Sequence, residues 1–167
     1  MLDDDEASVR FYTAEALGFL GDEKIGYELT RVLLNDADDR VRLEALRSLD
    51  AIKAAKEANS VMSAISDTST QVKIYAIELS ALWNNDRAKP KIVQMLKYDK
   101  NEGVRAACAT ALGVYKDKST VPDLINALSD SDTDVRIYVL ESLKKITSQD
   151  HGFNKTEWEE WYNSNKG

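Results

Sequence analysis

The chain has little of what most catalytic, metal-binding or secreted proteins need. Its 167 residues include one cysteine, one histidine, two prolines and seven glycines. A single cysteine cannot form an intrachain disulfide framework, and a single histidine cannot supply a histidine-rich metal site. No stretch approaches the roughly 20 uncharged apolar residues that span a bilayer, and the acidic start at Asp3, Asp4 and Asp5 is unlike an export signal. We therefore expect no enzyme, no metal, no cofactor and no membrane span.

The composition is that of a folded, acidic domain. Apolar residues make up 43% and charged residues 31% of the chain, and 29 acidic against 22 basic side chains give a net charge of -7. This apolar content is enough for one or two small domains with a core. The alternation typical of strands is absent. A lone cysteine fits a reducing cytoplasm and leaves the periplasm open.

An internal repeat dominates the sequence. A valine followed by a basic residue recurs five times at spacings of 32, 31, 32 and 31, and an aspartate stands five residues before each valine. The five registers are Asp4 with Val9-Arg10, Asp36 with Val41-Arg42, Asp67 with Val72-Lys73, Asp99 with Val104-Arg105, and Asp130 with Val135-Arg136. Small or apolar residues follow at positions 4, 8 and 11 after each valine, with few exceptions. These offsets fall on one helical face, so each valine is predicted to begin an amphipathic helix.

A second series of apolar pairs lies before each of the last four aspartates. The pairs are Leu29/Leu33, Val61/Ile65, Ile92/Leu96 and Leu124/Leu128. Turns rich in Asp, Asn and Ser separate this first helix of each pair from the second one that the valine begins. We predict a half-repeat at 1–21, helix pairs at 22–54, 55–85, 86–116 and 117–147, and a capping segment at 148–167. In that segment Trp158, Trp161 and Tyr162 are expected to form a short helix over the second helix of the last pair.

The repeat resembles a known family. The run Ala14-Glu15-Ala16-Leu17-Gly18-Phe19-Leu20-Gly21-Asp22, echoed at Ala109–Gly113, is similar to the HEAT repeat, in particular its phycobilisome-lyase-like subclass. The stretch from Ile146 to Asn154, followed by Trp158 and Trp161, is similar to the closing segment of such proteins. The resemblance implies an all-α, right-handed α-solenoid of about 4.5 helix pairs with a C-terminal capping helix, used as an interaction surface. Some members of the family attach bilins or bind nucleic acid.

The repeated charges favour a structural interpretation. Each aspartate can cap the second helix of its pair and also bind the basic residue of a neighbouring repeat, which forms a ladder along the stack. The predicted ladder consists of Asp4, Asp36, Asp67, Asp99 and Asp130 with Arg10, Arg42, Lys73, Arg105 and Arg136.

Residues two, three and six after each valine lie opposite the predicted core face. The candidate partner-binding residues at these positions are Phe11, Tyr12, Glu15, Leu43, Ile74, Tyr75, Glu78, Ile137, Tyr138 and Glu141. The three tyrosines recur every 63 residues, so the period is two repeats. Either they pack against neighbouring second helices, or they form a ridge for an extended or helical partner with apolar anchors and basic residues. Both interpretations stay open at this point.

The sequence favours a non-catalytic scaffold or regulatory module that binds another protein, of unknown identity, through the face lined by second helices. Because residues 1–4 are interpreted as the end of a first helix, we expect a fragment of a longer protein. A bilin lyase subunit, which the resemblance allows, is the alternative. A nucleic-acid-binding or DNA glycosylase-like solenoid is third and is disfavoured by the acidic charge. Cys108 is expected in the core, and His151 in a loop.

Overall fold

The computed structural model describes residues 1–165, except for the side chain of Glu23. This part of the chain contains ten α-helices and no strand. The helices are α1 (Ala7–Leu20), α2 (Gly26–Asn35), α3 (Asp39–Ala51), α4 (Ala58–Ala64), α5 (Thr70–Leu82), α6 (Lys89–Tyr98), α7 (Glu102–Tyr115), α8 (Val121–Ala127), α9 (Thr133–Thr147) and α10 (Lys155–Asn165). Short 3-10 turns precede α2, α4, α6 and α8. The prediction of an all-α helical-repeat fold is confirmed.

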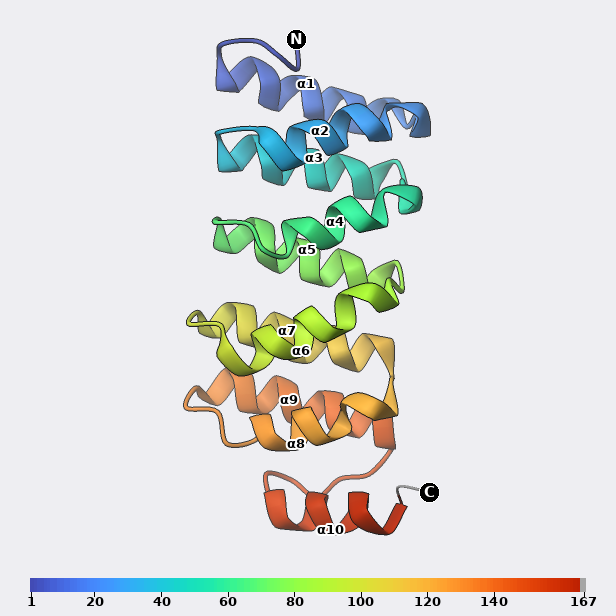
Figure 1. The fold of residues 1–167 in the computed structure, drawn as a ribbon, viewed down its shortest axis with the longest axis vertical. Coiled ribbons are helices and arrows are strands. Elements are labelled where there is room, and N and C mark those ends of the chain that lie inside the picture. Colours follow the sequence, from blue (N-terminus) through green and yellow to red (C-terminus); the bar gives the residue numbers. More distant parts are fainter. Residues whose placement is uncertain (166–167) are drawn as a thin grey trace. The chain divides into compact units, whose positions relative to one another are not determined.

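The chain forms two compact units, Met1–Asn85 and Asp86–Gly167. In the first unit α1, α3 and α5 pack side by side, while α2 lies against α3 and α4 against α5, so that second helices and first helices form two layers (Figure 1). This arrangement follows from the apolar stripe on each second helix, which must be buried against another helix.

The second unit repeats this two-layer packing. Here α7 packs against α9, α6 against α7, and α8 against α9. The predicted capping helix exists as α10, but it packs mainly on α8, the first helix of the last pair, rather than on the second helix as expected. Its Trp158 is fully buried, and the Trp158 indole Nε1 donates to the backbone oxygen of Gly152 at 2.9 Å. The remaining surface of α10 is rich in exposed Glu and Asn.

Three of the second helices, α3, α7 and α9, begin with a two-step cap, which corrects the simpler cap that the sequence suggested. The carboxylate of the ladder aspartate accepts a hydrogen bond from the backbone amide two residues later in the chain. The Asp38 amide, for example, donates to Asp36 at 2.9 Å. The residue that presents this amide then caps the helix itself, as Asp38 does by accepting the amide of Arg40. Asn101 and Asp132 cap α7 and α9 in the same way. The ladder aspartate therefore fixes the turn, and the residue two positions later caps the helix.

Two seams between second helices are unusually close. Gly18 of α1 lies against Ser48 of α3, and Gly113 of α7 lies against Ser142 of α9. A Cβ atom added to Gly113 would stand 2.5 Å from Oγ of Ser142, so only glycine fits there. The Ser142 hydroxyl donates across the seam to the backbone oxygen of Ala109 at 2.8 Å. These contacts set the spacing of α1 from α3 and of α7 from α9.

The predicted core face is buried along α3, α5, α7 and α9. Their anchor residues Val41, Val72, Val104 and Val135 are at most 1% exposed. Helix α1 is the exception, because no first helix covers it in residues 1–165. The register predicted Leu20 in the core, but its side chain is 74% exposed.

Candidate protein-binding site

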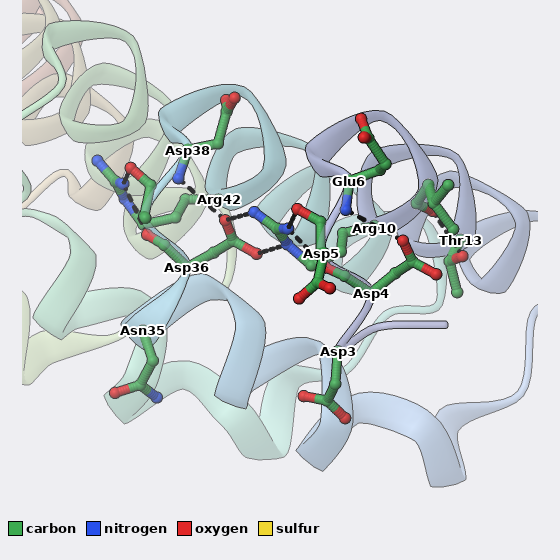
Figure 2. A network of polar contacts seen from close by, with 12 residues as sticks. Asp3, Asp4, Asp5, Glu6, Arg10, Thr13, Asn35, Asp36, Asp38 and Arg42 are labelled. Atoms are coloured by element: carbon green, nitrogen blue, oxygen red, sulfur yellow. Dashed lines mark hydrogen bonds and ion pairs between the residues drawn. The ribbon is translucent and has the colours of Figure 1, made fainter.

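The ladder is built from paired hydrogen bonds between neighbouring repeats. Arg10 of α1 donates from Nε and Nη2 to the two carboxylate oxygens of Asp36, at 2.7 and 2.9 Å. Its Nη1 donates to the backbone oxygen of Asp4 at 2.7 Å, so one guanidinium joins the turn before its own helix to the turn before α3 (Figure 2). Arg42 binds Asp67 in the same manner, with both distances at 2.8 Å.

The described part of the second unit contains one such pair. Arg105 donates to Asp130 at 2.8 and 2.9 Å. Arg136 donates to the backbone oxygens of Asp130 and Ser131 and to the hydroxyl of Thr133, and no described carboxylate receives its guanidinium. Lys73 and Asp99 lie in different units, and the pairing expected between them stays a prediction.

The ladder aspartates are held in their charged form. Hydrogen bonds from Arg10 keep the pKa of Asp36 below its ordinary value, against the opposing effect of burial. For Asp67 and Asp130 burial alone would raise the pKa, but hydrogen bonds from Arg42 and Arg105 and from backbone amides hold it below the ordinary value. Bidentate pairs that are mostly shielded from water stabilise a fixed geometry and lose much when one partner is removed.

The tyrosines predicted to line a ridge are not equivalent. The Tyr75 hydroxyl donates to Asp50 of α3 at 3.0 Å, and burial together with this carboxylate raises the pKa of Tyr75 to about 12. Tyr75 thus packs in the seam between α3 and α5, which agrees with the packing interpretation, and its part in a binding ridge stays a prediction. Tyr12 is 65% and Tyr138 43% exposed. Tyr138 belongs to the second unit, so its spacing from the others stays a prediction.

The other predicted binding residues divide by exposure. Glu78, Ile137 and Glu141 are exposed, whereas the remaining four are half-buried: Phe11, Glu15, Leu43 and Ile74. Desolvation by its neighbours raises the pKa of Glu78. The Phe11 ring meets the Tyr12 ring edge-on, with centroids 5.3 Å apart.

Two strongly exposed apolar side chains of the second helices lie at a position that the sequence analysis did not single out. Phe19 of α1 and Leu82 of α5, each ten residues after the anchor valine, are 84% and 67% exposed. The signal was present, because α1 and α5 carry apolar residues around most of their circumference. We define the second-helix surface of the first unit as Glu15, Phe19, Arg47, Glu78 and Leu82, which occupy positions six and ten after each valine on α1, α3 and α5.

The single cysteine and the single histidine lie in different surroundings. No group of three or more His, Cys, Asp or Glu side chains in residues 1–165 could hold a metal ion. Cys108 is fully buried. The His151 ring packs edge-on against Trp158, with centroids 4.8 Å apart, and lies in a loop as expected. No helix in this range is long and apolar enough to cross a bilayer.

The sequence profile of HEAT repeats matches residues 1–79 and 90–151. The chain belongs to the HEAT-repeat family. Protein YibA of Escherichia coli, in strains K12 and O157:H7, is 33% identical over 150 residues, which is 81% of this chain and 52% of that protein. This HEAT-repeat chain therefore spans about half the length of the curated relatives it matches.

The fold is also similar to a solved structure. A chain in the complex of CpcE and CpcF of phycocyanin lyase from Nostoc sp. PCC7120 superposes with a TM-score of 0.73 at 17% identity, over 98% of this chain and 66% of that one. At this identity the likeness shows the HEAT-repeat fold alone.

Proposed function

We propose that this HEAT-repeat chain is a non-catalytic interaction module, a scaffold or a regulatory domain, that binds another protein through its second-helix surface. The exposure of Phe19 and Leu82 beside Glu15 and Glu78 carries the proposal. Large apolar side chains contribute most of the affinity of a protein interface when they are desolvated, and charged residues around them select the partner.

The charges of this surface indicate what the partner carries. Glu15 and Glu78 place two carboxylates beside the apolar side chains, against the single guanidinium of Arg47. A partner with apolar anchors flanked by Lys or Arg fits this pattern. Nucleic acid does not fit, because the net charge of -7 repels a phosphate backbone.

The proposal is tested by a pair of surface variants. Phe19→Ser with Leu82→Ser removes the two apolar anchors, and Tyr27→Ser with Tyr98→Ser is the matched control, since it removes two equally exposed aromatic residues from first helices. Proteins captured from extracts of the native cells are quantified by mass spectrometry, after circular dichroism has verified folding. We expect the first variant, and not the control, to lose a specific protein by at least about tenfold, as the loss of two anchors predicts. Equal capture by both variants contradicts the proposal.

A bilin lyase subunit is the second candidate, and the likeness of the fold to a chain in the phycocyanin lyase complex is what favours it. The full burial of Cys108 leaves this chain without an exposed thiol for pigment attachment. Incubation of the purified chain with bilin and an apo-phycobiliprotein separates the two candidates: covalent pigment on the acceptor would replace the interaction-module proposal with the lyase.

A further inference from the structure

Hydrogen bonds join α1 and α3 at two places along their seam. Near the N-terminal ends, Arg10 binds Asp36 in the turn before α3. Further along, the buried Ser48 hydroxyl of α3 donates to the backbone oxygen of Ala14 at 2.8 Å. The contact is tight, because a Cβ atom added to Gly18 would stand 2.7 Å from Oγ of Ser48. A buried, directional bond to the backbone fixes the register of the two helices and resists sliding.

The seam between α3 and α5 has the same ladder bond but a different second contact. Arg42 of α3 binds Asp67, in the turn before α5, with both distances at 2.8 Å. The positions that hold glycine and serine in the seam of α1 and α3 are occupied here by Asp50 and Leu79. Leu79 is buried, but apolar contacts have no preferred direction and therefore do not fix a register.

The Tyr75 hydroxyl supplies a directional contact across this second seam. It reaches from the first half of α5 to Asp50, near the end of α3, and donates to the carboxylate at 3.0 Å. Both residues are half-buried, whereas Ser48 is only 2% exposed. Water competes for a half-buried hydrogen bond, so this bond should open more readily than the serine bond of the first seam.

We propose that the seam between α3 and α5 is an adjustable joint within the first unit. In this joint the C-terminal end of α5 slides past α3, while α1 and α3 move as one body. The Arg42–Asp67 bond is the fixed point, and the Tyr75–Asp50 bond holds the closed position. Small sliding movements of packed helices are an established form of conformational change in proteins.

The joint regulates the second-helix surface, and in this respect the inference rests on the proposed function. Leu82 is the last residue of α5, and Phe19 lies near the end of α1. Movement of α5 against α1 and α3 therefore changes the spacing of these two exposed apolar side chains. A partner that binds both of them selects one spacing from those that the joint allows.

Pairs of nitroxide spin labels measure the joint in the free chain. Each chain receives two cysteines at positions that are exposed on all three second helices. The substitutions are Phe19→Cys, Ala51→Cys and Leu82→Cys near the C-terminal ends, and Ser8→Cys, Arg40→Cys and Gln71→Cys near the N-terminal ends. The native Cys108 is fully buried and should stay unlabelled. Electron paramagnetic resonance then gives a distance distribution for each pair of neighbouring helices.

The widths of these distributions distinguish a joint from a uniform stack. We expect the distribution between labels at positions 51 and 82 to be at least about twofold broader than that between positions 19 and 51, because the Ser48 bond holds only the latter seam. The two N-terminal pairs, 8 with 40 and 40 with 71, should have similar widths, since a ladder bond is present in both seams.

A pair of tyrosine variants tests the bond that closes the joint. Tyr75→Phe removes the hydroxyl and should broaden the distribution between positions 51 and 82 without changing that between 19 and 51. Tyr12→Phe is the matched control, because Tyr12 is the same position of α1 and its hydroxyl has no hydrogen-bond partner in residues 1–165. It should change neither distribution. Circular dichroism verifies that each labelled chain is folded.

Two results would overturn the joint: equal widths for the two C-terminal pairs, or unchanged widths in Tyr75→Phe. Its regulatory role is tested in the capture experiment, where Tyr75→Phe should change by at least about twofold the amount of the protein that depends on Phe19 and Leu82. Tyr27→Phe, on a first helix, should not. Equal capture by these two variants would contradict regulation. If no captured protein depends on Phe19 and Leu82, the proposed function fails, while the label distances still decide whether the joint exists.

Discussion

The guanidinium of Arg105 binds both carboxylate oxygens of Asp130, 25 residues further along the chain, at 2.8 and 2.9 Å, and its third nitrogen donates to the backbone oxygen of Asp99 at 3.0 Å. One side chain thus joins the turns before α7 and α9. Both side chains are only about a tenth exposed, so water cannot replace the lost partner easily.

Arg105→Ala is therefore expected to lower the free energy of unfolding by about 1–3 kcal/mol, because it leaves a shielded carboxylate unpaired. Denaturation in urea measures the change. Arg40→Ala is the control: Arg40 pairs with Asp38, but its side chain is 76% exposed, and such surface pairs contribute about 0–1 kcal/mol. Equal losses in the two variants would contradict a structural role for the ladder.

Gly113→Ala tests the close seam of α7 and α9. The added Cβ would lie 2.5 Å from Oγ and 2.9 Å from Cβ of Ser142, so the helices must separate. Alanine favours a helix over glycine by about 1 kcal/mol, but we expect overpacking of about 1–3 kcal/mol to prevail and the melting temperature to fall. Ser142→Gly in the same chain should restore part of the loss. A rise in melting temperature for Gly113→Ala alone would contradict the close seam.

The repeat and its register could be predicted from the sequence because both depend on spacing. Periodicity alone gives the valines, the aspartates five residues before them and the helix pairs. The predicted core face is buried on four of the second helices, α3, α5, α7 and α9. Properties that depend on a neighbouring helix could not be predicted so directly. Tyr75 points away from the core of its own pair, but α3 brings Asp50 to its hydroxyl, and nothing in the register of α5 indicates this.

The capping error has a similar origin. Position alone allows Asp36 to cap α3, yet its carboxylate accepts the amide of Asp38, which becomes the cap. Two acidic residues in one short turn compete for the same role, and the geometry of the turn decides between them. Leu20 was misplaced because its burial requires a first helix that residues 1–165 do not provide.

Stability should depend on pH through the ladder aspartates. The pKa of Asp36 is held below its ordinary value of 3.8 by hydrogen bonds from Arg10, so the unfolded chain binds a proton before the folded one does. The stabilisation is complete above the ordinary value and is lost as the pH falls through the lower value of the folded state. Asp36→Asn should destabilise the chain at pH 7, and its free energy of unfolding should fall less than that of the wild type between pH 5 and about 3. If the urea midpoints of the variant and the wild type changed in parallel across this range, stability would not depend on the pKa of Asp36.

The C-terminal ends of the second helices contain residues in left-handed backbone conformation. Gly21 has φ +68°, and Lys116 has φ +53° at the equivalent position after α7. A residue with a Cβ atom pays about 1 kcal/mol or more for this conformation, which glycine adopts freely. Lys116→Gly is therefore expected to raise the free energy of unfolding by about 0.5–1 kcal/mol. Lys118→Gly, in the following 3-10 turn, is the control and should not be stabilising.

Trp158 is the buried residue of α10, the helix that packs on α8. Its indole is fully buried, donates from Nε1 to the Gly152 backbone oxygen at 2.9 Å and meets the Trp161 ring edge-on at 6.0 Å. Trp158→Phe removes the donor and leaves a cavity, so we expect a loss of about 1–3 kcal/mol. Trp161→Phe alters a half-buried ring without a buried hydrogen bond and should cost less than about 1 kcal/mol.

Hydrogen exchange of α8 and α10 measures the local effect of the two variants. We expect faster exchange in Trp158→Phe than in Trp161→Phe, because α10 then leaves the surface of α8 more often. The same exchange rates in both variants would show that the buried indole does not hold the cap.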